Sequence, residues 1–129
     1  GLNQLAMLIE QARGAGLDVR IEITGGERPL PAAVDLAAYR IVQEALTNVL
    51  RHAHARHACI RLAYNEGGVE VEVSDDGRGL GTGPRSEGGR GLRGMAERAA
   101  AVGGSVEAGP AADGGFRVLA RLPLGEATA

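Results

Sequence analysis

The sequence predicts an α/β (α+β) two-layer sandwich, in which three helices cover one face of a mixed, mostly antiparallel sheet of about five strands. Segments with apolar residues at every third or fourth position predict the helices, and shorter segments with apolar residues at every second position predict the strands. Their order is helix, strand, helix, two strands, a long glycine-rich loop, helix and two strands. Runs of this kind favour helices layered on one face of a single sheet.

The composition is that of one globular domain. The 129 residues are 44% apolar and 23% charged, which gives one core and excludes a disordered chain. The only aromatic residues are Tyr39, Tyr64 and Phe116, and the formal net charge is −2. We therefore expect no nucleic-acid partner, because stacking platforms and a basic excess are both missing. All 14 basic residues are arginine, which excludes a Walker-A phosphate loop and a Schiff-base lysine.

Cysteine usage and hydropathy bear on the compartment. Cys59 is the only cysteine, so the chain forms no internal disulfide, and a lone thiol fits a reducing compartment. The sequence has neither a signal peptide nor an apolar run of about 18 residues. We therefore expect a cytoplasmic location and no membrane contact by this region. The chain begins at Gly1 without an initiator methionine. We expect a fragment of a longer protein, and a membrane anchor elsewhere in that protein stays open.

The first two elements are a helix over residues 2–15 and a strand over residues 19–24. The helix has its apolar side chains on one face, and two glycines end it. The strand reads Val-Arg-Ile-Glu-Ile-Thr, and this alternation predicts one buried face. Two glycines and two prolines then break the pattern before the next helix.

An amphipathic helix is predicted over residues 37–55, with Asp35 as its N-cap. One face is apolar and suits a core. The polar face carries Glu44, Asn48 and His52, each four residues after the last. A carboxylate, a carboxamide and an imidazole then rise along one side of the helix, with a drift of roughly 40° per step. This polar stripe is the first candidate site.

The remaining elements follow in short succession. Strands over residues 58–64 and 69–73 flank a turn and should pair antiparallel. From Gly77 to Gly94 the sequence holds eight glycines, which predicts a mobile loop. A helix over residues 92–102 and two strands, residues 105–108 and 116–122, complete the pattern.

The sequence Asp75-Asp76-Gly77-Arg78-Gly79 directly follows a strand with alternating valines. A carboxylate at a strand end can accept a hydrogen bond from an exocyclic amino group, and glycines let a flat ring approach the backbone. The alternative is an ordinary Asp-Gly turn.

A second glycine cluster, Gly88 to Gly94, opens the predicted helix at Leu92. Free backbone N–H groups at a helix start favour phosphate. Residues 89–94 also spell G-x-G-x-x-G, but a dinucleotide fold would need a strand directly before this motif, and here a long loop precedes it. The alternative is a flexible loop without a ligand.

Oxygen donors on the second helix suggest a metal brought in with a phosphate group. The carboxamide of Asn48 could share Mg²⁺ with a phosphate, and Glu44 could orient or deprotonate a nucleophile. Solvated polar residues are the alternative for both. Zinc binding by the three histidines, His52, His54 and His57, has only weak support from their spacing, and we interpret His54 and His57 as surface residues.

Together these motifs resemble the boxes of the histidine-kinase-type ATPase superfamily (GHKL, Bergerat fold). Residues 43–53, QEALTNVLRHA, are similar to its N box. Residues 75–79 match its D-x-G-x-G box, and residues 89–92 match its second glycine box. The segments AYRIVQEALTN and GLRGMAERA resemble one subfamily, the sensor histidine kinases of the NarL/DesK type. The resemblance covers roughly residues 15–124.

The resemblance implies an ATP-binding catalytic domain. Such a domain transfers the γ-phosphoryl group of Mg-ATP to a histidine on its own protein's dimerisation and phosphoacceptor domain, for relay to a response regulator. Glu44 would be the acid–base residue that readies the substrate histidine, and Asn48 would ligate Mg²⁺. Arg51 and His52 would face the phosphates. Asp75 would bind the adenine amino group of ATP or ADP.

The resemblance also assigns the glycines and the domain limits. Gly77 and Gly79 would shape the adenine pocket, and Gly89, Gly91 and Leu92 would anchor a flexible ATP lid formed by residues 80–88. Residues 1–14 would be a helix leading in from the dimerisation region, residues 15–124 would form the ATPase domain, and residues 125–129 would be a disordered tail.

Two features depart from the family pattern. No histidine precedes His52, so we expect the phosphoacceptor histidine outside this chain. The last hairpin has Gly115-Phe116 where the family often has Gly-Thr, so the threonine contact near adenine is either lost or replaced by the ring packing near the base. Two alternative functions stay open: an anti-sigma-factor serine kinase on the same fold, and a nucleotide-sensing interaction module without catalysis.

Overall fold

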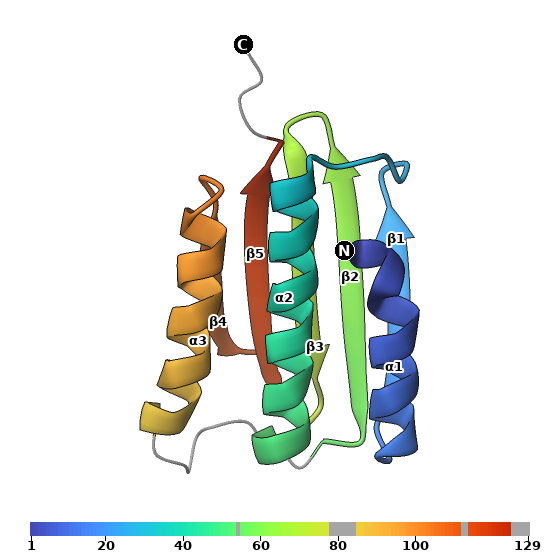
Figure 1. Ribbon diagram of the computed structural model, residues 1–129. Helices are drawn as coiled ribbons and strands as arrows, with labels where there is room; N and C mark the ends of the chain where they lie inside the picture. The colour runs from blue at the N-terminus through green and yellow to red at the C-terminus, as the bar shows by residue number, and fades with distance from the viewer. Residues whose placement is uncertain (54, 78–84, 112–113, 125–129) are drawn as a thin grey trace.

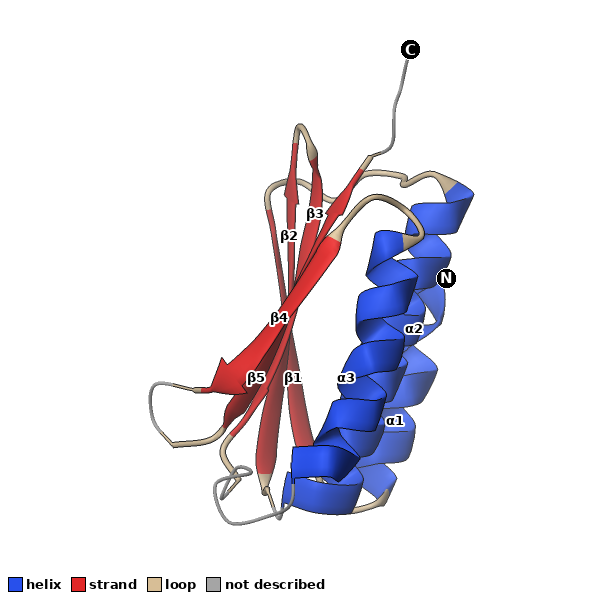
Figure 2. Ribbon diagram, turned by 90° about the vertical axis from the view of Figure 1, so that its left-hand side faces the viewer, coloured by secondary structure: helices blue, strands red, loops and turns tan. Residues whose placement is uncertain are grey.

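Five strands form one sheet and three α-helices lie on one of its faces in the part of the chain that the structure describes (Figure 1 and Figure 2). The structure is a computed structural model and describes residues 1–53, 55–77, 85–111 and 114–124. In chain order the elements are the 3-10 turn η1 (Leu2–Gln4), α1 (Leu5–Gly14), β1 (Asp18–Thr24), α2 (Ala32–Asn48), the π-helical turn η2 (Val49–Ala53), β2 (His57–Asn65), β3 (Gly68–Asp75), α3 (Arg85–Ala100), β4 (Ser105–Pro110) and β5 (Phe116–Pro123).

The strand order is β1-β2-β3-β5-β4. The β1–β2 pair is parallel, and the other three pairs are antiparallel. A parallel pair cannot be closed by a short turn and needs a crossover connection, which α2 provides. The predicted mixed, mostly antiparallel sheet with helices on one face is confirmed.

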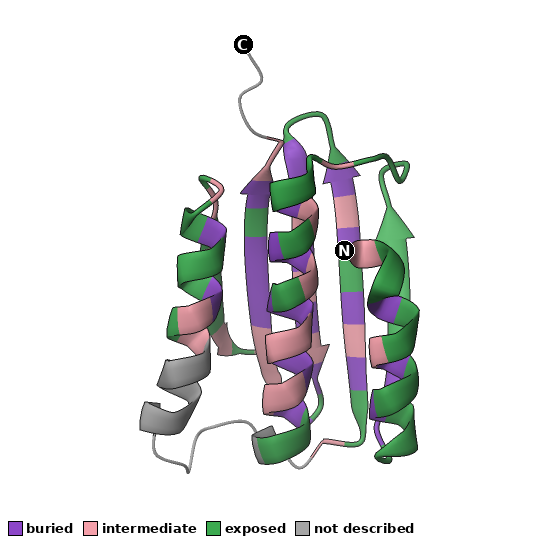
Figure 3. Cartoon of the chain, in the orientation of Figure 1, coloured by how far each residue is buried: buried purple, intermediate pink, exposed green. Residues whose placement is uncertain are grey.

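The core lies between α2 and the centre of the sheet. α2 buries one apolar stripe that includes Ile41 and Val42, both with no exposed surface. Every second residue of β2 and β3 is buried against it, among them Ile60 and Val71. Figure 3 shows the buried positions of the helices turned toward the sheet. Because aromatics are so few, the packing depends on the interlocking of aliphatic side chains, with Met95 of α3 also fully buried.

The other face of the sheet is charged. Arg61 lies between two buried residues of β2, so its side chain points away from the helices. Its Nε is 3.0 Å from Glu22 Oε1 on β1, and its Nη1 is 3.4 Å from Glu72 Oε1 on β3. Glu72 also pairs with Arg117 on β5. This row of alternating charges crosses four strands and keeps that face compatible with water.

Strand β1 is less buried than its alternation predicts. Val19 is fully buried, but Ile21 and Ile23 on the same face are 38% and 44% exposed. The reason is that β1 is an edge strand, and its arrowhead end extends beyond the start of α1, so the helix does not cover it (Figure 1). The prediction of a continuous buried face on this strand was wrong.

The start of α2 also differs from the prediction. The helix begins at Ala32, with Pro31 as its N-cap, so Asp35 is not the cap. Pro31 has an extended ψ of 147°, and its carbonyl accepts the first helical hydrogen bond from Asp35 N at 2.9 Å. The carboxylate of Asp35 instead accepts a hydrogen bond from Leu2 N at 2.9 Å and ties η1 to α2.

The start of α3 is the largest departure from the prediction. The helix begins at Arg85, seven residues before the predicted Leu92, so Gly89 and Gly91 lie within it rather than in front of it. The glycine-rich sequence before Leu92 predicted a mobile loop instead, and each glycine disfavours a helix by about 1 kcal/mol relative to alanine. Of the predicted lid, residues 80–84 lie outside the described residues, and residues 85–88 belong to α3. The predicted tail, residues 125–129, also lies outside the described part.

None of the helices in the described parts of the chain is long and apolar enough to cross a membrane.

Side-chain truncations on the buried and exposed faces of α2 should differ in their effect on the free energy of unfolding. Ile41→Ala removes a fully buried side chain and should lower the free energy of unfolding by about 2–5 kcal/mol. Leu36→Ala on the same helix truncates a side chain that is 50% exposed and should change it by less than about 1 kcal/mol. Urea unfolding followed by circular dichroism measures both. Equal losses for the two variants would contradict the described packing of α2.

Candidate functional site

Several candidate residues lie at one end of the sheet, the lower end in Figure 1. α2 ends there at Asn48, β3 ends there at Asp75, and α3 and β5 begin there. α2 contacts α3, β3 and β5 directly. The structure therefore brings the polar stripe of α2 and the Asp75 box, which are 27 positions apart in the chain, to the same end of the fold.

The last two turns of α2 carry Glu44 and Asn48. Both are partly buried, and Asn48 is the final α-helical residue before the π-helical turn η2. π-Helical turns are rare and often occur at functional sites. Arg51, within η2, is exposed. The backbone of His52 belongs to the same turn, but its side chain lies outside what the structure describes, so its predicted orientation stays untested.

Asp75 is the one buried charged residue among those the structure describes, with 8% of its surface exposed. It is in phase with Val71 and Val73 of β3, so it faces the helices. Its Oδ1 accepts a hydrogen bond from Gly77 N at 2.8 Å, which offsets part of the cost of burying a carboxylate. Gly77 is itself buried. Gly79 lies outside the described residues.

The β4–β5 hairpin approaches the backbone of Asp75 closely. A Cβ atom at Gly115 would stand 1.7 Å from the carbonyl oxygen of Asp75, so only glycine allows the approach. Phe116 follows and opens β5 one residue before Arg117, the partner of Ser74, which places it level with Asp75. Its ring is partly buried and packs against the core. Sequence reasoning did not single out Gly115 for this contact.

Sequence reasoning also missed a second contact set, formed by Asp76. Its Oδ1 accepts hydrogen bonds from Arg56 N at 3.0 Å and His57 N at 2.9 Å, and its Oδ2 lies 2.7 Å from His57 Nδ1. The pKa of this carboxyl is lowered to about 2, chiefly because the backbone N–H of His57 donates to it. His57 also approaches Asp18, with 3.7 Å between Nε2 and Oδ2. The contacts of Asp76 join residues 19 and 20 positions apart, which local spacing cannot reveal.

The structure tests metal binding by the described residues but does not test the three-histidine zinc hypothesis. Within the described residues, no group of three or more His, Cys, Asp or Glu side chains could hold a metal ion. His57 is exposed, as predicted, and engaged with two aspartates. His54 lies outside the described part, so the three-histidine zinc hypothesis stays untested. Cys59 is partly buried, and burial raises the pKa of its thiol.

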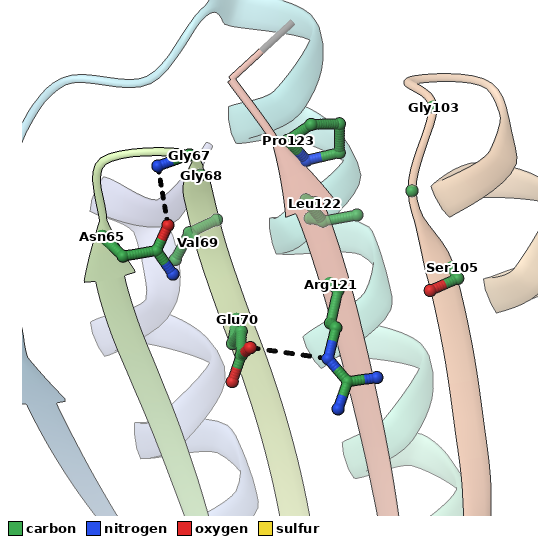
Figure 4. Close-up of a pocket in the computed structure, with 11 residues that line it drawn as sticks. Asn65, Gly67, Gly68, Val69, Glu70, Gly103, Ser105, Arg121, Leu122 and Pro123 are labelled. Carbon is green, nitrogen blue, oxygen red and sulfur yellow. Dashed lines mark hydrogen bonds and ion pairs between the residues drawn. The ribbon is translucent and has the colours of Figure 1, made fainter.

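Two recesses lie at the opposite end of the sheet. One, of about 400 Å³, is formed around the β2–β3 turn and the end of β5 (Figure 4). Its polar groups already bond to each other: Asn65 Oδ1 accepts from Gly67 N at 2.8 Å, and Arg121 Nε is 3.5 Å from Glu70 Oε2. The other, of about 460 Å³, lies between η1 and the β1–α2 loop. Neither contains any residue of the candidate site.

Comparison with known proteins identifies the family. Residues 33–126 match the family described as histidine kinase-, DNA gyrase B- and HSP90-like ATPase. The chain belongs to this ATPase family. The resemblance of its three boxes, stated from the sequence, is thereby confirmed at the level of the family.

Relatives of this ATPase domain include sensor histidine kinases. The chain is 38% identical over 126 residues to the sensor histidine kinase YxjM of Bacillus subtilis (strain 168), and 33% identical over 124 residues to the sensor histidine kinase LnrJ of the same organism. These alignments cover 96% and 95% of this chain and 30% of each relative. The ATPase domain therefore spans less than a third of the length of either relative.

Solved structures share the fold. The blue-light activated histidine kinase EL346 of Erythrobacter litoralis has a TM-score of 0.73 at 25% identity, covering 98% of this chain and 45% of that one. The ATP-binding domain of PrrB from Mycobacterium tuberculosis has a TM-score of 0.62 at 26% identity, covering 92% of this chain and 91% of that one. The predicted fold is confirmed, while the roles of individual site residues remain predictions.

The approach of the β4–β5 hairpin to Asp75 can be tested with two glycines of that hairpin. Gly115→Ala places a Cβ against the Asp75 carbonyl and should lower the free energy of unfolding by about 1–3 kcal/mol. Gly109→Ala adds a Cβ that meets nothing within 4 Å and should stay within about 0.5 kcal/mol of the wild type. Urea unfolding measures the difference, and equal stability of the two variants would contradict this approach.

Proposed function

We propose that this chain is the catalytic ATP-binding domain of a two-component sensor histidine kinase of the NarL/DesK type, acting in the cytoplasm. It transfers the γ-phosphoryl group of ATP to a histidine on the dimerisation domain of its own protein, for relay to a response regulator. The observation that carries the proposal is the buried carboxylate of Asp75 at the same end of the sheet as Glu44 and Asn48, in a chain of this ATPase family.

The buried carboxylate of Asp75 supports adenine as the base of the bound nucleotide. A carboxylate is an acceptor, and adenine offers an amino donor where guanine offers a carbonyl acceptor. Because Asp75 is 8% exposed, a wrong base would leave a buried charge facing an acceptor, which is costly. Gly77 beside it and Phe116 level with it carry no polar side chain that would compete with the base for this carboxylate. As the family resemblance implies, Gly77 and Gly79 would shape the adenine pocket.

The end of α2 supports binding of the phosphates. Mg²⁺ prefers oxygen ligands and, with a nucleotide, takes only one or two of them from the protein. The carboxamide of Asn48 is such a donor, so the residues present fit the ion. Bound there, Mg²⁺ would neutralise charge on the phosphates. Arg51 and His52, in the next turn, would add positive charge or hydrogen-bond donors.

Glu44 would act on the incoming substrate histidine. It lies one helical turn before Asn48 and is partly buried, so it can meet a side chain that approaches the phosphates from outside. A carboxylate in this place would hold or accept the proton of the imidazole as its other nitrogen attacks the γ-phosphorus. The adenosine diphosphate would then leave with the bridging oxygen.

The observed start of α3 changes how the predicted lid residues would reach the nucleotide. Gly89, Gly91 and Leu92 lie within the helix, so they would meet the nucleotide through the helix surface and not through free N–H groups at a helix start. Glycines on that surface would let a phosphate approach the helix closely.

Asp75→Asn should weaken nucleotide binding without unfolding the domain. Replacing the acceptor with a group that also donates should lower ADP affinity about ten-fold or more in the presence of Mg²⁺. Glu107→Gln, the same chemical change at an exposed ion pair on the far face, should leave affinity unchanged. Isothermal titration calorimetry measures both, with GDP as the second ligand. Absence of wild-type binding at millimolar ADP, or equal affinity for ADP and GDP, would refute the proposed base site.

Glu44→Gln should separate binding from phosphoryl transfer. In a protein that contains this domain and its histidine-bearing domain, the variant should bind ADP normally and lose phosphohistidine about 100-fold or more. Labelling with γ-³²P-ATP measures the transfer, with Glu66→Gln in the distant β2–β3 turn as the control. Unchanged labelling would remove Glu44 from this role. An acid-stable product would indicate a serine kinase instead, because phosphohistidine is acid-labile.

A further inference from the structure

We propose that Asp76 and His57 are positioning residues that hold Asp75 in its binding orientation and thereby set nucleotide affinity. The proposal rests on the proposed function, because it takes Asp75 as the residue that accepts the adenine amino group. We call Asp76 and His57, with the backbone they join, the clasp.

The clasp extends the β2–β3 ladder beyond its last strand pair. That pair is Ala58 with Asp75. The next backbone bond runs from Asp76 N to His57 O at 3.1 Å. The side chain of Asp76 then turns back and receives the backbone N–H groups of Arg56 and His57 at 3.0 and 2.9 Å. One side chain therefore satisfies two donors at the start of β2 and fixes where β3 ends.

Fixing Asp76 also fixes Asp75. Neighbouring residues of a strand point to opposite faces, so the tie of Asp76 to β2 holds Asp75 toward the helices. Gly77, directly after Asp76, donates its N–H to Asp75 Oδ1 at 2.8 Å. Gly115 packs against the Asp75 carbonyl on the other side. A rotation of the Asp76 backbone would therefore displace the Gly77 donor and the Asp75 carbonyl together.

His57 closes the clasp from the outside. Its Nδ1 is 2.7 Å from Asp76 Oδ2, and its Nε2 is 3.7 Å from Asp18 Oδ2 on β1. Two carboxylates thus face the ring, one from the end of β3 and one from the start of β1, and the backbone N–H groups of Arg56 and His57 face Asp76. These donors lower the pKa of Asp76 to about 2. The carboxylate therefore stays charged, and the clasp stays closed, at neutral pH.

A purely stabilising role would make different predictions. In that case, loss of Asp76 would lower stability but leave the Asp75 carboxylate and its ligand contact in place. The amide of Gly77 separates the two cases, because its N–H reports directly on the position of Asp75 Oδ1. This readout needs no nucleotide.

The first experiment follows the Gly77 amide by ¹H–¹⁵N NMR. Asp76→Ala should shift its resonance and reduce its protection from hydrogen exchange, because the donor and acceptor move apart. His57→Ala should cause a smaller shift, since the two backbone donors to Asp76 remain. Asp18→Asn, which removes the other carboxylate facing His57, is the matched control and should leave the amide unchanged. A Gly77 amide that is unchanged in both alanine variants overturns the proposal.

The second experiment measures ADP affinity with Mg²⁺ by calorimetry. Asp76→Ala should weaken binding about ten-fold, while Asp76→Asn, which keeps the Oδ1 acceptor, should restore it to within about three-fold of the wild type. Where Asp76→Ala does not fold, His57→Ala compared with Asp18→Asn gives the same test. Wild-type affinity in a variant whose Gly77 amide has moved overturns the link to binding. Failure of the wild type to bind ADP refutes the proposed function, and the amide result then still decides whether the clasp positions Asp75.

The pH dependence of stability gives an independent readout of the clasp. A carboxyl group whose folded pKa of about 2 lies below its ordinary value of 3.8 stabilises the fold above pH 3.8, and this contribution is lost as the pH falls toward 2. The difference in urea midpoint between wild type and Asp76→Asn should therefore be constant from pH 7 to about pH 5 and shrink below about pH 4. A difference that does not shrink in acid overturns the assigned contacts of Asp76.

Discussion

The parallel pairing of β1 with β2 is the constraint on which the rest of this structure depends. Such a pair needs a crossover, and α2 runs back along the sheet to supply it. The last turn of α2 must then lie at the end of the sheet where β2 begins. The antiparallel β2–β3 pair returns the chain to that same end. The topology alone therefore brings Asn48, at the end of α2, and Asp75, at the end of β3, to the same end of the sheet.

Much of the fold could be predicted because its core elements are strongly periodic. α2, β2 and β3 are buried on one face, and their alternation is visible in the sequence. The errors occur where tertiary context overrides local pattern. Ile21 and Ile23 alternate correctly but lie on an edge strand that α1 covers only in part. The start of α3 was misplaced because glycine-rich sequence disfavours a helix only weakly, and packing of the rest of α3 against α2 and β4 can outweigh it.

The candidate site also contains residues that could be predicted from the sequence and contacts that could not. Glu44, Asn48 and Asp75 could be selected from the sequence, because their spacing and their position at element ends carry chemical meaning. The contacts of Gly115 and Asp76 could not, because they depend on the register between β3, β5 and β2. No local sequence signal shows that a Cβ at Gly115 would stand 1.7 Å from the Asp75 carbonyl oxygen. None shows that Asp76 accepts a hydrogen bond from a backbone N–H 20 residues away.

Two adjacent aspartates at the end of β3 take opposite roles because a strand alternates its faces. Asp75 points into the helix layer, where it is buried and accepts a hydrogen bond from the backbone N–H of Gly77. Asp76 points outward, where it remains partly exposed and receives two backbone N–H groups and an imidazole nitrogen. In the proposed site, burial would make the Asp75 carboxylate selective for a hydrogen-bond donor, and the bonds of Asp76 would hold it as an anchor. A single acidic residue at this strand end could not face both the helices and β2, so the proposed selectivity and anchoring need two adjacent residues.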